Sequence, residues 1–116
     1  MLKFLLFVLL SFTSQISFAA EQACTKLATK INSMDDNYRP PLEAEVISNK
    51  RLYFYTAPNI QCKMKGVYVI KGNYLTVYKP YEDWLNVMFI NNDGEDYIGW
   101  ISAKQVQIKG QYGNNP

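Results

Sequence analysis

The sequence predicts a mostly β fold, a small β-barrel or sandwich with a short N-terminal α-helix tethered to it by a disulfide. Three observations indicate this. From Leu42 onward apolar and polar residues alternate, which is the spacing of half-buried strands. Turn sequences rich in Gly, Pro and Asn interrupt these runs at short intervals. Two cysteines, Cys24 and Cys62, form an even count in a chain with an export signal, which favours a disulfide.

The first residues predict a signal peptide covering residues 1–19. Lys3 precedes an apolar run from Phe4 to Leu10, and cleavage after Ala19 places Ser17 and Ala19 at the two small-residue positions. The apolar run is shorter than the roughly 20 residues that cross a bilayer. Polar residues before Cys24 disfavour a lipid anchor there. We therefore expect a periplasmic or secreted protein without a membrane anchor.

Length and charge limit the remaining possibilities. Removing 19 of the 116 residues leaves 97, enough for one domain. The chain has 12 Lys and Arg against 10 Asp and Glu, and loss of Lys3 makes this 11 against 10. Net charge therefore gives no support for a nucleic-acid partner.

The segment 20–41 predicts a helix followed by a rigid connector. From Cys24 to Met34 the apolar residues fall on one helical face, and Asp35 to Asn37 are expected to end it. Pro40 and Pro41 then favour an extended connector. A bridge from Cys24 to Cys62, 38 positions on, would stabilise the fold by about 4 kcal/mol in the chain-entropy model. The alternative, a reactive thiol, would have no histidine to activate it.

The segment 42–110 predicts the β domain, and 111–116 a flexible tail. The Asp93-Gly94 pair suits a hairpin turn, so Trp84–Ile90 and Tyr97–Ser102 should pair antiparallel. Another turn is expected at Lys79-Pro80-Tyr81. The remaining expected strands are Leu42–Val46, Leu52–Tyr55, Gly66–Lys71, Tyr74–Lys79 and Gln105–Lys109.

Residues 51–108 resemble the bacterial SH3-like domain family. The features that carry the resemblance are Ala57-Pro58 after the first strand, Trp84 with Val87, and Gly99-Trp100 before the short turn 102–104. The resemblance implies an SH3-like β-barrel and, in many members, recognition of cell-wall components or peptides. Tyr53 and Tyr55 stand where the family usually has asparagine and arginine, so the ligand contacts of those polar residues do not carry over.

Several chemistries have no sequence support. The chain has no histidine, so it offers no histidine-based nucleophilic system or metal site, and two cysteines cannot make a structural zinc site. The acidic clusters Glu82-Asp83 and 93–96 lie in expected turns, where an acid–base pair or a calcium site is disfavoured. We expect no catalytic residue, no metal and no cofactor.

The aromatic content instead favours a binding surface, because tyrosine combines an apolar ring with a polar tip. The alternation that places Leu52 and Phe54 in the core turns the neighbouring aromatic residues to the other face. Loops on a rigid barrel commonly carry binding residues, which favours the turn beside Trp84. Some of these aromatics are equally open to a structural role in packing. The predicted binding residues are Tyr53, Tyr55, Tyr78, Tyr81, Glu82, Asp83 and Trp84.

Two functions fit these expectations. The first is a non-catalytic periplasmic module that recognises cell-wall peptide or an envelope protein. The second is a periplasmic inhibitor or immunity protein that binds and blocks a toxin or a cell-wall hydrolase. Small size, export and the absence of catalytic residues fit both, and the sequence leaves the ligand and the oligomeric state open.

Overall fold

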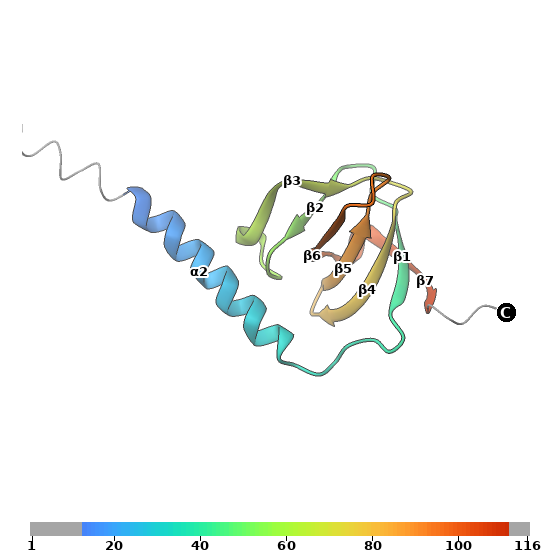
Figure 1. Cartoon of the computed structure of the whole chain (residues 1–116), viewed down its shortest axis with the longest axis horizontal. Coiled ribbons are helices and arrows are strands. Elements are labelled where there is room, and N and C mark those ends of the chain that lie inside the picture. Colours follow the sequence, from blue (N-terminus) through green and yellow to red (C-terminus); the bar gives the residue numbers. More distant parts are fainter. Residues whose placement is uncertain (1–12, 112–116) are drawn as a thin grey trace, which may run out of the picture.

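The computed structural model describes residues 13–111, and its first element is the helix α2, Thr13–Asn32, which projects away from a curved sheet (Figure 1). The helix predicted over Cys24–Met34 therefore exists, but it starts earlier and ends two residues sooner. Residues 13–23 contain no Gly or Pro, so nothing interrupts the helix on its N-terminal side. The predicted cleavage point after Ala19 lies within α2. The basic and apolar parts of the predicted signal peptide lie outside the described residues.

The described residues form one antiparallel sheet with the strand order β3-β2-β6-β5-β4-β1-β7. Its seven strands confirm the mostly β fold, but the sheet is not closed, because β3 and β7 are its two edges. The strands are β1 Leu42–Val46, β2 Leu52–Tyr55, β3 Lys63–Val69, β4 Tyr74–Tyr81, β5 Trp84–Ile90, β6 Asp96–Ser102 and β7 Val106–Gln111. Two short 3₁₀ helices, η1 (Ile60–Cys62) and η2 (Ala103–Gln105), precede β3 and β7.

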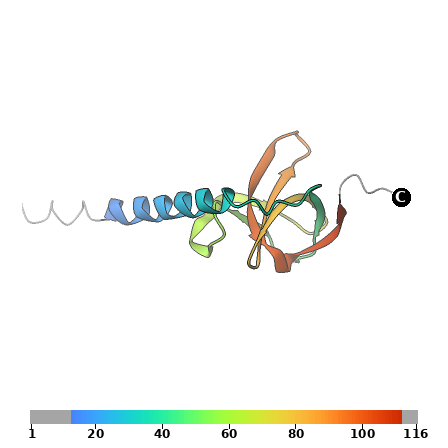
Figure 2. The same ribbon diagram turned by 90° about the horizontal axis from the view of Figure 1, so that it is seen from below.

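The sheet curls around an apolar core formed by every second residue of its strands (Figure 2). The predicted alternation holds: Leu52 and Phe54, which it places in the core, are both buried. The buried members of the core are Ala44, Val46, Leu52, Phe54, Val69, Leu75, Val77, Leu85, Val87, Ile101 and Val106.

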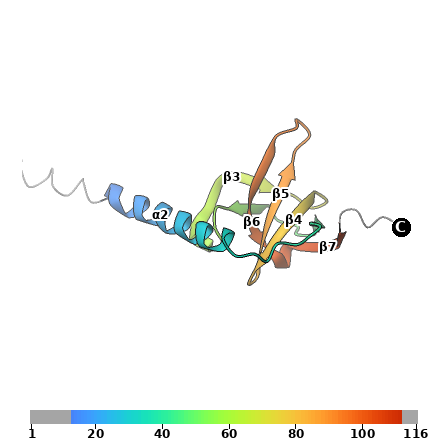
Figure 3. The same ribbon diagram turned by 60° about the horizontal axis from the view of Figure 1, so that its bottom comes forward.

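The hairpin of β5 and β6 confirms the predicted antiparallel pair, with Trp84 opposite Ser102 at one end and Ile90 opposite Asp96 at the other. Figure 3 shows this hairpin extending beyond the rest of the sheet. Gly94 at its tip has φ +81°, the left-handed conformation that glycine adopts without strain.

The turn predicted at Lys79-Pro80-Tyr81 is wrong, because β4 continues to Tyr81 and the chain turns at Glu82 and Asp83. Tyr81 lies opposite Trp84, so the turn has only two central residues. Pro80 is tolerated in the strand because β1 pairs only with Tyr74–Val77, so no strand lies beside Pro80 on that side. Other predicted bounds also differ: Gln111 belongs to β7 rather than to a tail, and β3 covers Lys63–Val69 rather than Gly66–Lys71.

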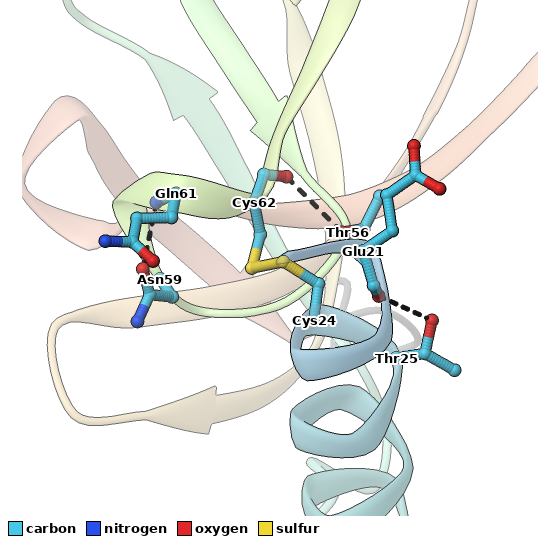
Figure 4. Close-up of a disulfide and its surroundings, with 7 residues drawn as sticks. All are labelled: Glu21, Cys24, Thr25, Thr56, Asn59, Gln61 and Cys62. Atoms are coloured by element: carbon cyan, nitrogen blue, oxygen red, sulfur yellow. Dashed lines mark hydrogen bonds between the residues drawn. A yellow bond between two sulfur atoms is a disulfide. The ribbon is translucent and has the colours of Figure 1, made fainter. Parts of the chain in front are cut away.

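Helix α2 is attached to the sheet region at two points. The Cys24–Cys62 disulfide is present, with an S–S distance of 2.06 Å, and joins α2 to η1 (Figure 4). Leu27 and Ala28 pack beside it, and Ile31 is fully buried, as the predicted apolar face requires. At the other point the Lys79 side chain, from β4, donates hydrogen bonds to the carbonyl oxygens of Ile31 and Met34 at the end of the helix.

A β-bulge in β4 explains how Lys79 reaches the helix. Val77 lies opposite Val87, but Lys79 lies opposite Asn86, so Tyr78 is an extra residue. Val77 faces the core, and the inserted residue places Lys79 on the outer face together with Asn86. The end of α2 meets Lys79 on this face, and the connector after the helix runs beside β4, where the Tyr38 amide donates to the Tyr78 carbonyl oxygen at 2.7 Å.

Candidate functional site

The predicted binding residues from β2, β4 and β5 converge on the outer face of the sheet. Asn86 lies opposite Trp100, and Trp100 lies opposite Tyr55, so these side chains share one face. Trp84 is two residues from Asn86 on β5 and lies opposite Tyr81, which places both on the same face. Tyr53 shares it too, being two residues from Tyr55. We call the half-buried side chains of Tyr53, Tyr55, Trp84 and Tyr81 the aromatic row.

Ring contacts link the members of the aromatic row to one another and to the sheet. The ring centroids of Tyr55 and Trp84 are 4.9 Å apart in an edge-to-face arrangement. Tyr81 meets Trp100 edge to face at 6.5 Å. Trp100 is only 2% exposed although it lies on the outer face, so it supports the row and offers no surface of its own.

The β2–β3 end of the row carries positive charge. The rings of Tyr53 and Tyr68 lie 5.6 Å apart. The Lys63 ammonium lies 3.8 Å from the centre of the Tyr53 ring, and the Arg51 guanidinium lies 4.5 Å from the centre of the Tyr68 ring. Hydrogen bonding to the Tyr53 side chain, and after it the electrostatic interaction with Tyr68, raises the pKa of Arg51.

The β4–β5 end of the row carries negative charge. Glu82 and Asp83, the two central residues of the turn, are exposed. Glu82 has φ 51°, a left-handed conformation that is uncommon for a residue other than glycine. The Asp83 carbonyl oxygen accepts a hydrogen bond of 2.8 Å from the Ala103 amide, which fixes the turn against η2. The aromatic row therefore runs between two carboxylates and two cations.

Tyr78 does not join this group. It is the inserted residue of the β4 bulge, and its hydroxyl lies 3.6 Å from the Met88 sulfur, in the direction of the β5–β6 hairpin tip. Six of the seven predicted residues are thus close together on one part of the sheet, and the seventh lies outside it.

Sequence reasoning missed three residues that shape this face. The Arg51 guanidinium lies over the Tyr68 ring, and this contact depends on the β2–β3 register, which shifts between Tyr53 and Tyr55 and so could not be predicted. The third residue is Lys79, which is 3% exposed although the sequence around it predicts a turn. A lysine in the middle of a run with strand-like alternation was the only available signal.

The described residues offer neither a metal site nor an unpartnered buried polar atom at this face. They contain no group of three or more His, Cys, Asp or Glu side chains that could hold a metal ion. Within the same part of the chain, every buried side-chain nitrogen and oxygen has a hydrogen-bond partner, so no buried polar atom awaits a ligand. What the aromatic row can offer is ring faces, two cations and two carboxylates to a bound molecule.

The helices of the described region include none that is long and apolar enough to cross a membrane. Comparison with known proteins adds no assignment: no family model, no curated protein and no solved structure matches this chain.

Proposed function

We propose that this chain is an exported, non-catalytic binding module with an SH3-like β-barrel architecture, which recognises cell-wall peptide or an envelope protein through the aromatic row. In this proposal residues 1–19 are a signal peptide and the mature protein acts in the periplasm. The Cys24–Cys62 disulfide supports an oxidising compartment.

The observation that carries the proposal is the aromatic row with its charged ends. Half-buried tyrosines and a tryptophan on a rigid sheet bind with little loss of side-chain entropy, because each has only two rotatable side-chain bonds. Ring contacts already order Tyr55 and Trp84. Carboxylates at one end and cations at the other suit a peptide that carries both charges.

The test is co-sedimentation of the mature protein with purified peptidoglycan sacculi. We expect Trp84→Ala and Tyr81→Ala to weaken binding at least tenfold, because each removes one ring of the row. Tyr74→Ala is the matched control: Tyr74 is a 52% exposed tyrosine on the same strand as Tyr81 but outside the row. Circular dichroism must first show that all three variants fold.

Binding that the control retains and the row variants lose supports the cell-wall form of the proposal. A wild-type protein that stays in the supernatant contradicts that form and leaves an envelope protein, including a toxin or hydrolase that this chain would inhibit, as the partner. Equal loss in all three variants contradicts the assignment to the aromatic row.

A further inference from the structure

Charges of opposite sign are separated along this chain although the net charge is near zero. Between Val46 and Glu82 there is no carboxylate, whereas the β2–β3 region carries Lys50, Arg51, Lys63, Lys65 and Lys71. From Glu82 to Ala103 the pattern is reversed, with five carboxylates and no Lys or Arg. The β2–β3 hairpin therefore carries positive charge and the β5–β6 hairpin carries negative charge.

The cations of the β2–β3 region have no carboxylate partner among the described residues. The ion pairs of the described residues lie elsewhere: they join Arg39 to Asp35, Lys79 to Asp36 and Lys109 to Glu45. Two of the unpaired cations are nevertheless held in place, since they lie over the rings of Tyr53 and Tyr68. A cation that is ordered and unpaired loses little further entropy when it meets an anion.

These cations border an open strand edge. β3 ends the sheet, so no described strand pairs with its outer side. Lysines at an edge usually keep other chains away. Here the same strand also carries an exposed apolar ring, since Tyr68 is 39% exposed, and Ile70 just after it is 53% exposed. Exposed apolar groups beside an open edge favour the addition of another strand.

Each face of β3 has a recess next to this edge. On the outer face a hollow of ≈ 430 Å³ is lined by Tyr53, Lys63, Met64, Lys65 and Gly66. On the inner face a cleft of ≈ 370 Å³ follows five consecutive residues, 66–70. The far wall of that cleft includes the aromatic side chains Phe54, Phe89 and Tyr97. One recess thus suits a carboxylate and the other an apolar side chain.

We propose that the free edge of β3 takes an extended, acidic protein segment as an added strand. Main-chain hydrogen bonds hold the segment along the edge, a carboxylate enters the hollow at Lys63 and Lys65, and an apolar side chain enters the cleft beside Phe89. Successive side chains of a strand point to opposite faces. The acidic and apolar side chains of the partner therefore lie an odd number of positions apart. This inference does not depend on the function proposed for the aromatic row.

The acidic hairpin explains why a short protein segment fits better than a long polyanion. Tyr97 and Asn91 line the cleft, and both lie within hydrogen-bonding distance of the Glu95 carboxylate, at 3.4 and 3.3 Å. Asp93 and Asp96 lie nearby in sequence on the same hairpin. A nucleic acid or an anionic membrane that covered the basic side would bring further negative charge toward these carboxylates.

The test measures binding of fluorescein-labelled peptides to the disulfide-bonded protein by fluorescence anisotropy. The probe is GEVEVEVG, which places glutamate and valine on opposite faces of a strand. Its matched control, GEEEVVVG, has the same composition without the alternation. We expect the probe to bind at least tenfold more tightly than the control, and hydrogen exchange of the β3 amides to slow when it binds.

Two charge variants locate the site. We expect Lys63→Gln/Lys65→Gln to weaken probe binding about tenfold or more. Lys26→Gln/Lys30→Gln makes the same charge change on the exposed side of α2 and should leave binding within twofold. Equal losses in both variants, equal binding of the two peptides, unchanged exchange at β3, or tighter binding to phosphatidylglycerol vesicles or to a single-stranded oligonucleotide would each overturn the proposal.

Discussion

Replacing Lys79 by methionine tests how the end of helix α2 is held. Lys79 is 3% exposed, and its ammonium donates to the carbonyl oxygens of Ile31, at 2.8 Å, and Met34. Carbonyl groups in the last turn of a helix have no partner within the helix, so a cation there satisfies them and interacts favourably with the helix dipole. Methionine has a similar length and no charge, so the substitution removes the hydrogen bonds with little loss of packing.

The expected loss of unfolding free energy is about 2–4 kcal/mol. A hydrogen bond that involves a charged group contributes roughly 1.5–3 kcal/mol, and Lys79 makes two. The sum is reduced because the Ile31 carbonyl keeps the Met34 amide as a second partner, at 3.0 Å. The Asp36 carboxylate, 3.4 Å from the ammonium, adds little, because its side chain is 46% exposed and solvent screens it.

Urea unfolding followed by tryptophan fluorescence measures this quantity, since Trp84 and Trp100 both lie in the sheet. Two controls isolate the carbonyl contacts: Asp36→Asn and Lys104→Met should each change the unfolding free energy by no more than about 0.5 kcal/mol, because both side chains are exposed. A Lys79→Met variant within 0.5 kcal/mol of wild type, or an Asp36→Asn variant as destabilised as Lys79→Met, would refute the reasoning.

Three further predictions concern stability. Cys24→Ser/Cys62→Ser should lower the unfolding free energy by about 4 kcal/mol and abolish its dependence on reducing agent; a loss below about 1 kcal/mol would show that the tether matters little. Gly99→Ala should destabilise by about 1–3 kcal/mol in thermal unfolding, because the new Cβ would lie 3.0 Å from the Tyr55 carbonyl oxygen; an unchanged melting temperature would contradict that contact. Glu82→Gly should raise the unfolding free energy, measured in urea, by about 0.5–1 kcal/mol. The left-handed φ of Glu82 costs roughly 1–2 kcal/mol, and the greater conformational entropy of glycine in the unfolded chain offsets part of the gain. A loss of stability would mean that the Glu82 side chain itself contributes.

Most of the sheet could be predicted because its signals are local. Alternation identified β1, β2, β4 and β5 within one or two residues of their observed bounds, and Asp93-Gly94 identified the β5–β6 hairpin. The errors arose where long-range contacts decide. The start of α2 was missed because its first residues fall in the predicted signal peptide. The third strand was predicted to start three residues late and to end two residues late, because Gly66, with φ +75°, lies inside it at an irregularity.

The candidate site was predictable to a similar degree and for a related reason. Alternation with core residues places Tyr53, Tyr55 and Trp84 on the face opposite the core, whichever strands pair with theirs. Their common face therefore follows from the pattern alone. A bulge changes that parity, and no local signal announced the one in β4. This explains both the inclusion of Tyr78 among the predicted residues and the omission of Lys79.

The pairing of β1 with β7 has a consequence for how the chain can fold as it emerges. Leu42, near the start of the sheet, lies opposite Gln111, the last described residue, so β1 keeps one open side until the final strand is delivered. The sheet can therefore be completed only after β7 has been synthesised, although the other strand pairs do not need it. Such late closure slows folding, as contacts between distant residues generally do.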